Sequence, residues 1–373
     1  MAASLAGGDG GQLACYDCAP TGTDAIPGCH PSENGVKIRF FPIYESRVAH
    51  QTCVVGMHKS LGVNAVVDSA KLHWKMSGLC LFLAAAVTGA SASDIEPRSY
   101  TNVPVGLNYL VAGYTYTQGG VGFSPALSLA NGNIKIHSTF LSYVRSLDIW
   151  GRSGKFAVVI PEASLSGQAD IDGEPRKRVT SGFGDPAVKL SVNLYGAPAL
   201  PSEQFESYRQ DTIVGASVAV TAPGGQYDPK ELVNLGTNRW TFKPDIGVSK
   251  KWGAFTTEIS ASALFFSDNT DYLQGKLLQQ APIYSFQGHA IYNFAPEFWC
   301  SLDANYYFGG GTFTDHTDDA NRQQNWHVGG NLEFAVNRQN TVKLFGYTGV
   351  YARTGNNYDN VGVAWEYRWG GGL

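Results

Sequence analysis

A serine and a histidine on one predicted strand are the residues best placed for catalysis. Ser285 and His289 share one face of that strand, and Ser301 and Asn305 lie on the next strand. Nucleophilic hydrolysis needs a serine within hydrogen-bond reach of a base that a third polar group orients. Four residues along a strand span about 13 Å, so Ser285 and His289 cannot touch directly. A lipase site built across strands stays open as an alternative, but we expect no enzyme.

A cysteine cluster near the start of the chain has the donor types of a zinc site. Cys15 and Cys18 form a Cys-x-x-Cys pair, and Cys29 with His30 follows at short spacing. Thiolates and imidazoles suit tetrahedral zinc, but no second pair follows at the spacing of a zinc ribbon. The sequence also lacks a Gly-x-Ser-x-Gly elbow, a zinc-binding helix motif and a phosphate loop. We therefore predict no metal site and no cofactor.

An export signal stands well inside the chain. A basic flank at Lys71 and Lys75 precedes the apolar run Leu79–Val87, and the small residues Ala90–Ala92 follow. These three parts are the layout of a secretory signal, and the run is shorter than the roughly 17 to 25 residues that span a bilayer. A buried core helix is the alternative. We predict a signal peptide over residues 76–92, with cleavage between Ala92 and Ser93.

Cleavage there divides the chain into three parts. Residues 1–75 would be an extension that is either wrongly annotated or disordered, since Met57 or Met76 could be the true start. Residues 93–373 would be the mature protein. This part holds one of the six cysteines, Cys300, so it cannot form an intramolecular disulfide.

The mature part alternates between apolar and polar residues with a period of two. Within residues 254–266, for example, Phe255, Ile259 and Phe265 share one face and Glu258 lies on the other. Strands with one apolar and one polar face show this pattern. Twelve segments have it, at residues 103–116, 133–148, 155–168, 181–195, 211–222, 239–250, 254–266, 282–294, 297–308, 325–336, 341–353 and 359–369.

The connections between these segments alternate between tight turns and long polar loops, except for the long connection 196–210 on the short-turn side. Outer-membrane barrels have short periplasmic turns and longer outer loops, with aromatic residues at both interfaces. Aromatic residues do recur near the segment ends, as at Trp240, Trp252 and Trp369. A secreted soluble β-protein is the alternative. We predict an all-β fold, a transmembrane up-and-down antiparallel β-barrel of about 12 strands in the outer membrane of a Gram-negative bacterium.

Several short motifs resemble a family of outer-membrane proteins named for the MetA pathway of phenol degradation. They are Gly182–Pro186 followed by Leu194–Gly196, then Ala222–Asp228, Asn234–Trp240 and the ending Val361–Leu373. The resemblance covers about Ile95 to Leu373 and rests on the order and spacing of these motifs. It implies an outer-membrane barrel that passes hydrophobic or aromatic compounds, and it supplies no catalytic residues.

The polar face of each strand should line the lumen, because a basic side chain facing lipid at mid-membrane costs roughly 2 to 4 kcal/mol. Pairing across strands, which would merely fill the interior, is the alternative for each charge. Five rings, Tyr114, Tyr143, Trp299, Tyr307 and Tyr347, are candidates for stacking with a solute. The predicted charged lumen residues are Lys135, Arg145, Glu162, Asp185, Lys189, Lys243, Asp245, Glu258, His289, Asp303, Glu333, Lys343, Glu366 and Arg368.

A lumen with both signs of charge does not resemble a one-sign ion filter. We therefore predict a channel for passive uptake of hydrophobic or aromatic small molecules, and a closed structural or surface-interaction barrel is the alternative. Its expected partners are membrane lipid, the barrel-assembly machinery and lipopolysaccharide, which the basic run 176–178 would meet in an outer loop. A net charge of −4 gives no support to nucleic-acid binding.

Overall fold

The computed structural model describes residues 95–120, 129–171, 174–353 and 357–372. The predicted signal peptide at residues 76–92, its cleavage site, the extension 1–75 and the cysteine cluster within it lie outside the described residues. None of the helices in the described part is long and apolar enough to cross a bilayer.

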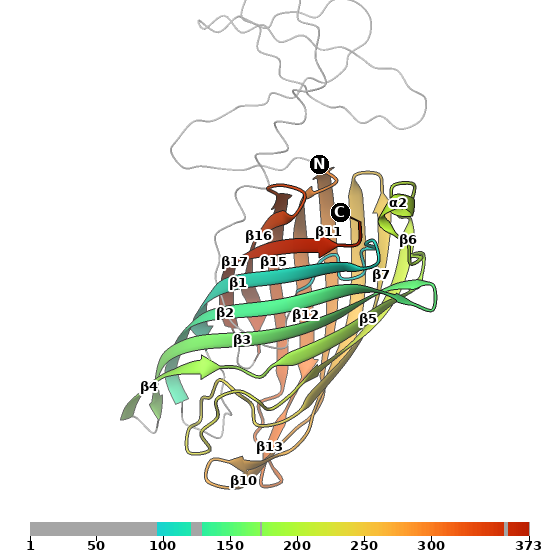
Figure 1. Cartoon of the computed structure of the whole chain (residues 1–373). Helices are drawn as coiled ribbons and strands as arrows, with labels where there is room; N and C mark the ends of the chain where they lie inside the picture. The colour runs from blue at the N-terminus through green and yellow to red at the C-terminus, as the bar shows by residue number, and fades with distance from the viewer. Residues whose placement is uncertain (1–94, 121–128, 172–173, 354–356, 373) are drawn as a thin grey trace, which may run out of the picture. The chain divides into compact units, whose positions relative to one another are not determined.

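Twelve strands of the described residues form the wall of a closed antiparallel barrel (Figure 1). Each strand pairs with its neighbours along the chain, and the last strand, β17, returns to pair with β1. The wall strands are β1 Leu107–Gly120, β2 Leu129–Ile149, β3 Arg152–Ile171, β5 Ala187–Tyr195, β6 Thr212–Thr221, β7 Thr241–Trp252, β8 Phe255–Phe266, β11 Ile283–Ala295, β12 Phe298–Gly309, β15 Gln323–Ala335, β16 Asn340–Ala352 and β17 Asn357–Gly370.

The fourth predicted strand is divided into two. β4, Glu174–Phe183, pairs with the far part of β3, and β5 pairs with the near part of the same strand. Residues 184–186 between them leave the ladder, and they include a proline, which has no N–H to donate. β3 therefore has two successive partners on one edge.

The long outer loops contain structure of their own. Parts of the two loops 267–282 and 310–322 form a second, four-stranded sheet in the order β14-β13-β10-β9. On the opposite side, the long connection between β5 and β6 contains the short helix α2, Ser202–Phe205. The small strands are β9 Asn269–Tyr272, β10 Lys276–Gln280, β13 Thr312–Thr314 and β14 Thr317–Asp318.

The outer face of the wall is apolar, as the period-two pattern predicts. Large hydrophobic side chains are exposed along strand after strand, where a soluble β-protein would place polar residues. Aromatic rings lie near the strand ends, including Trp252, Trp326 and Trp369. The exposed aliphatic side chains include Leu190, Ile246, Ile259, Leu302, Leu344 and Val363. The prediction of a transmembrane β-barrel of about 12 strands is confirmed.

Candidate functional site

The segment 95–106, which precedes β1, lies inside the barrel. The backbone oxygen of Ser99 accepts a hydrogen bond from Lys155 Nζ on β3 at 3.0 Å. The backbone oxygen of Ile95 accepts one from the Tyr347 hydroxyl on β16 at 3.4 Å. The backbone N–H of Arg98, also in this segment, donates to Glu258 on β8. A segment that touches strands all around a closed barrel must lie in the lumen. The sequence leaves open whether residues 93–102 are a short periplasmic lead or an inward plug, and the contacts of the described residues 95–102 show a plug. The plug continues to residue 106, because the first strand begins at Leu107 and not at the predicted residue 103.

Tyr100 anchors the plug in a notch of the wall. A Cβ added to Gly215 would lie 2.0 Å from the Tyr100 ring, and one added to Gly247 would lie 2.5 Å from it. The ring therefore occupies the space that side chains at these two positions would fill. Its hydroxyl donates to Asp245, and the ring packs with Ala197 and Ile213 in a buried cluster. Burial and the Asp245 carboxylate both raise the pKa of Tyr100.

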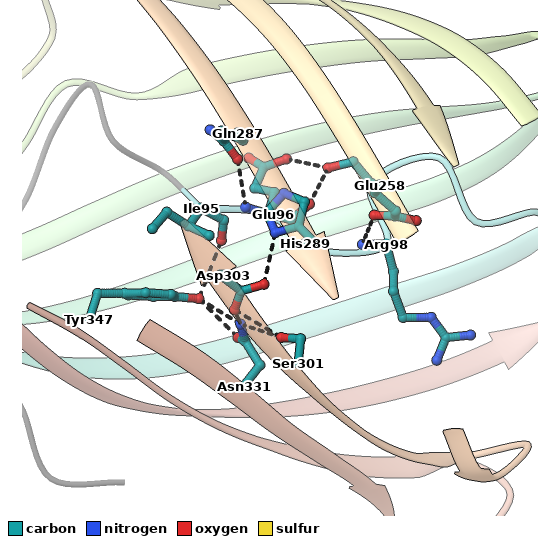
Figure 2. Close-up of polar contacts among 11 residues, drawn as sticks. Ile95, Glu96, Arg98, Glu258, Gln287, His289, Ser301, Asp303, Asn331 and Tyr347 are labelled. Carbon is teal, nitrogen blue, oxygen red and sulfur yellow. Dashed lines mark hydrogen bonds and ion pairs between the residues drawn. The ribbon is translucent and has the colours of Figure 1, made fainter. Parts of the chain in front are cut away.

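The carboxylate of Asp303 is the centre of a buried polar cluster (Figure 2). It lies 2.8 Å from Nδ1 of His289 and accepts from Ser301 Oγ at 2.8 Å and Asn331 Nδ2 at 2.7 Å. Asn331 also bonds to the hydroxyl of Tyr347, which in turn reaches Ile95. The cluster thus connects four wall strands, β11, β12, β15 and β16, to the start of the plug.

The plug is also held by backbone bonds and ion pairs. The N–H of Glu96 donates to Gln287 Oε1 at 3.4 Å, and the N–H of Arg98 donates to Glu258 Oε2 at 2.6 Å (Figure 2). The Glu96 carboxylate forms an ion pair with Lys189. Burial alone would raise the pKa of Glu96, but Lys189 and Lys243 outweigh it and lower the pKa to about 2.

A buried indole stabilises the cationic part of the plug. The guanidinium of Arg98 lies 5.1 Å from the centre of the Trp299 ring, and Lys343 Nζ lies 5.9 Å from it. Trp299 Nε1 donates to Glu333 Oε1 at 2.9 Å. Cations near an aromatic face are attracted by its quadrupole, so Trp299 holds Arg98 against the wall. Burial lowers the pKa of Arg98, and the carboxylates of Glu333 and Glu258 oppose this shift.

A cavity remains between the plug and one side of the wall. Its lining combines both charge signs with small side chains, and it contains no cluster of aromatic rings. The residues that line it include Glu96, Lys189, Ala219, Lys243, Asp245 and Gln287. Such a lining offers hydrogen bonds to a polar group rather than an apolar pocket.

Most of the predicted lumen residues do face inward. Lys189, Lys243, Asp245, Glu258 and His289 line the cavity, and Asp303 lies behind it. Glu333 and Lys343 contact the inward Trp299. Glu366 and Arg368 share a face with Ala364, which lies opposite Lys343. Asp185 lies at the break between β4 and β5, where it bonds to a loop.

Three predicted lumen residues lie on the outer face instead. Lys155 points inward, so its neighbour Phe156 points outward. Arg145 lies opposite Phe156, and Glu162 follows Phe156 at an even spacing on β3. Lys135 lies opposite Ser166, which also follows Phe156 at an even spacing on β3 and therefore points outward. Arg145 lies near Tyr143 and Trp369, and its Nη1 donates to Asn108 Oδ1 at 3.2 Å. Glu162 lies opposite the exposed Phe183 and accepts from Thr139 Oγ1 at 3.4 Å.

The aromatic rings proposed for solute stacking are not gathered in the lumen. Trp299 and Tyr307 face inward but are 2% and 1% exposed, so no solute can lie against them in this conformation. Tyr114 lies opposite the outer-face residue Thr139, and Tyr143 packs near Trp369 on the same outer face. Tyr347 contacts the plug.

The hydrolase alternative has no geometric support at the residues considered. Ser285 Oγ donates to Asn305 at 2.6 Å, whereas His289 is paired with Asp303. The serine that shares Asp303 with the histidine, Ser301, donates to the carboxylate and not to the imidazole. Among the described residues no group of three or more His, Cys, Asp and Glu side chains could hold a metal ion.

Sequence reasoning missed three residues that hold the plug. Lys155 directly follows a predicted turn and was assigned to no site, and Gln287 is an uncharged residue on a strand rich in polar residues. Tyr100 lies before the first predicted strand. A signal for Tyr100 does exist, because Gly215 and Gly247 lie inside predicted strands, and a glycine there marks a bulge or the close approach of another group.

The family model described as "Putative MetA-pathway of phenol degradation" matches residues 111–367. No curated protein matches the chain.

Three of the solved structures that match the chain are outer-membrane proteins of low sequence identity, and the first of them shares its fold. The COG4313 outer membrane channel from Pseudomonas putida F1 is 18% identical, with a TM-score of 0.65, and the match covers 74% of this chain and 100% of that one. The β domain of the Bordetella autotransporter BrkA is 8% identical, with a TM-score of 0.45, over 71% and 100%. The CymD monoaromatic hydrocarbon channel is 8% identical, with a TM-score of 0.37, over 76% and 94%. The first of these similarities, together with the apolar outer face, shows an outer-membrane β-barrel.

Proposed function

We propose that this chain, which belongs to the family described by the MetA pathway of phenol degradation, is a passive channel for small hydrophobic or aromatic molecules. The observation that carries this proposal is the plug. Residues 95–106 occupy the lumen through individual hydrogen bonds, the ion pair of Glu96 with Lys189 and the contact of Arg98 with the Trp299 ring, and not as a strand of the wall. The plug can therefore move while the barrel stays intact.

The polar cavity narrows the class of solute. Its carboxylates, ammonium groups and amide could bond to a hydroxyl or carboxylate on an otherwise apolar ring. A small aromatic molecule that carries such a group, as a phenolic compound does, fits this lining better than a pure hydrocarbon. This reading agrees with the pathway for which the family is described.

Single-channel recording tests the proposal. Protein purified from outer membranes would be inserted into a planar bilayer, and phenol or 4-hydroxybenzoate would be added to one side. We expect an ion current that these solutes interrupt briefly, and no interruption by a sugar of similar size. An absence of current would instead support the closed structural or surface-interaction barrel. Interruptions by both kinds of solute would contradict the aromatic specificity.

A further inference from the structure

Two lysines lie in one row across three adjacent strands of the wall. Lys189 on β5 lies opposite Ala219 on β6, and Ala219 lies opposite Lys243 on β7. Because neighbouring strands are about 4.8 Å apart, the two lysine Cα atoms lie roughly 10 Å apart, and their long side chains can converge on one group. All three residues line the cavity, and Ala219 is too small to separate the ammonium groups. The row therefore presents two positive charges to one place in the lumen.

A carboxylate of the plug occupies this place. Glu96 forms an ion pair with Lys189. Burial opposes the charged form of Glu96, yet Lys189 and Lys243 together lower its pKa, so both ammonium groups act on this one carboxylate. The lumen thus contains a binding site for a carboxylate, and the plug itself supplies the occupant.

Lys243 has capacity for a further carboxylate. Among the described residues it forms no ion pair and donates no hydrogen bond. The two other carboxylates at the cavity accept from the plug, Asp245 from the Tyr100 hydroxyl and Glu258 from the N–H of Arg98. An organic acid that enters the cavity therefore meets one ammonium group whose donors are unused, beside the one that holds Glu96.

The start of the plug depends on this ion pair more than the rest of the plug does. The backbones of Ile95 and Glu96 are held by two hydrogen bonds of 3.4 Å, which is longer than the usual range of roughly 2.7 to 3.2 Å. The following residues are held by bonds of 2.6 and 3.0 Å and by the Tyr100 anchor. Among the described residues the plug has no ion pair other than that of Glu96. Loss of this pair would free the start of the plug while Tyr100 stays in its notch.

We propose that a carboxylate on the solute competes with Glu96 for Lys189 and Lys243, and that its binding releases the start of the plug. This inference rests on the proposed channel function, and it names the solute class, small aromatic acids, and the contact that keeps the lumen restricted in their absence. One carboxylate replaces another on the same two ammonium groups, and no covalent bond changes. Because the chain holds Glu96 at an effective concentration on the order of millimolar, a free acid should act at about millimolar concentrations.

Benzoate and its neutral analogue benzamide test this competition. Protein purified from outer membranes would be recorded in planar bilayers at pH 7 and constant ionic strength. We expect saturating benzoate to raise the mean ion current about threefold, and benzamide or phenol only to interrupt the current. Glu96→Gln keeps the backbone N–H that bonds to Gln287 but removes the charge. Its current should therefore be high without benzoate and should not rise further when benzoate is added.

Lys243→Met tests the solute site apart from the ion pair. We expect half of the benzoate response to need about tenfold more benzoate in this variant. Lys251→Met, which changes an exposed lysine near the end of the same strand, should leave the response as in the wild type.

Two results would overturn the competition and leave the channel standing. One is an equal rise in current with benzoate and benzamide, and the other is no rise with benzoate while phenol still interrupts the current. Absence of ion current under every condition would overturn the channel and the competition together.

Discussion

The imidazole of His289 lies 2.8 Å from the carboxylate of Asp303, deep in the wall beside the plug. Both side chains are nearly inaccessible, at 3% and 0% exposure. Such a pair resembles two members of a hydrolytic triad, but the nearby serine donates to the carboxylate and leaves the imidazole without a nucleophile. The pair is better explained as a structural support, because it joins β11 to β12. Asn331 and the Tyr347 hydroxyl then connect Asp303 to Ile95 in the plug.

Replacing Asp303 should therefore destabilise the barrel and not abolish an enzymatic activity. Asp303→Ala leaves three former partners without their acceptor, and we expect a loss of about 3 kcal/mol in the free energy of unfolding. Denaturant unfolding followed by heat-modifiable gel mobility measures this loss. Asp268→Ala, at an exposed loop position, should change stability by less than about 0.5 kcal/mol. A wild-type lipid hydrolysis that disappears in His289→Ala would contradict the structural role.

Filling the notch under Tyr100 should displace the plug. Gly215→Ala places a methyl group where the ring lies, and overpacking of this kind costs about 1 to 3 kcal/mol. We expect a larger mean ion current in planar bilayers. Gly288→Ala is the matched control, since a Cβ there meets nothing within 4 Å. Adding Gly215→Ala to Tyr100→Ala should have no further effect, and an additive effect would show that Gly215 acts elsewhere.

Acid should loosen the plug only well below neutral pH. The pKa of Glu96 is lowered from its ordinary 4.5 to about 2, so its ion pair stabilises docking fully above about pH 4.5 and is lost as pH falls toward 2. We expect the ion current to stay constant between pH 7 and pH 5 and to rise below about pH 4. Lys189→Met removes the main partner, so the ion current should already be larger at pH 7 and should rise less in acid. A rise near pH 6 in the wild type would point to a different group.

The start of the mature chain is a direct prediction of the sequence. If the signal spans residues 76–92, protein purified from outer membranes should begin at Ser93, as mass spectrometry of its N-terminal peptide would show. The new terminus would then lie two residues before Ile95, which already contacts the wall. A first residue before Met76 would mean that the signal is not removed as predicted.

The strands and their order could be predicted because period-two alternation and turn composition are local properties. The division of the fourth strand was missed, although the outward apolar residues shift from the odd position of Phe183 to the even positions of Val188 and Leu190 across the break at Gly184–Pro186. What divides this strand is a pairing with β3 on one side and a loop on the other, and both involve residues distant in sequence.

The inner and outer faces were harder to assign than the strands. Polarity marks the lumen only within the lipid band, where the outside must be apolar. The outer face nevertheless carries Lys135, Arg145 and Glu162, and polar neighbours bond to two of them: Arg145 donates to Asn108, and Glu162 accepts from Thr139. The sequence could not decide for the plug, because residues 93–102 have no period and only the closed barrel reveals what surrounds them.

The β2–β3 hairpin extends far beyond what a membrane requires. The two strands have 21 and 20 residues, against 14 in β1, and 20 residues span about 66 Å against an apolar band about 25 Å tall. At the end of the barrel that carries the long loops, the far parts of β2 and β3 together with β4 therefore form a stiff, hydrogen-bonded arm. Antibodies or bacteriophages that recognise this arm would read its folded shape, and they would lose their target once the protein is boiled.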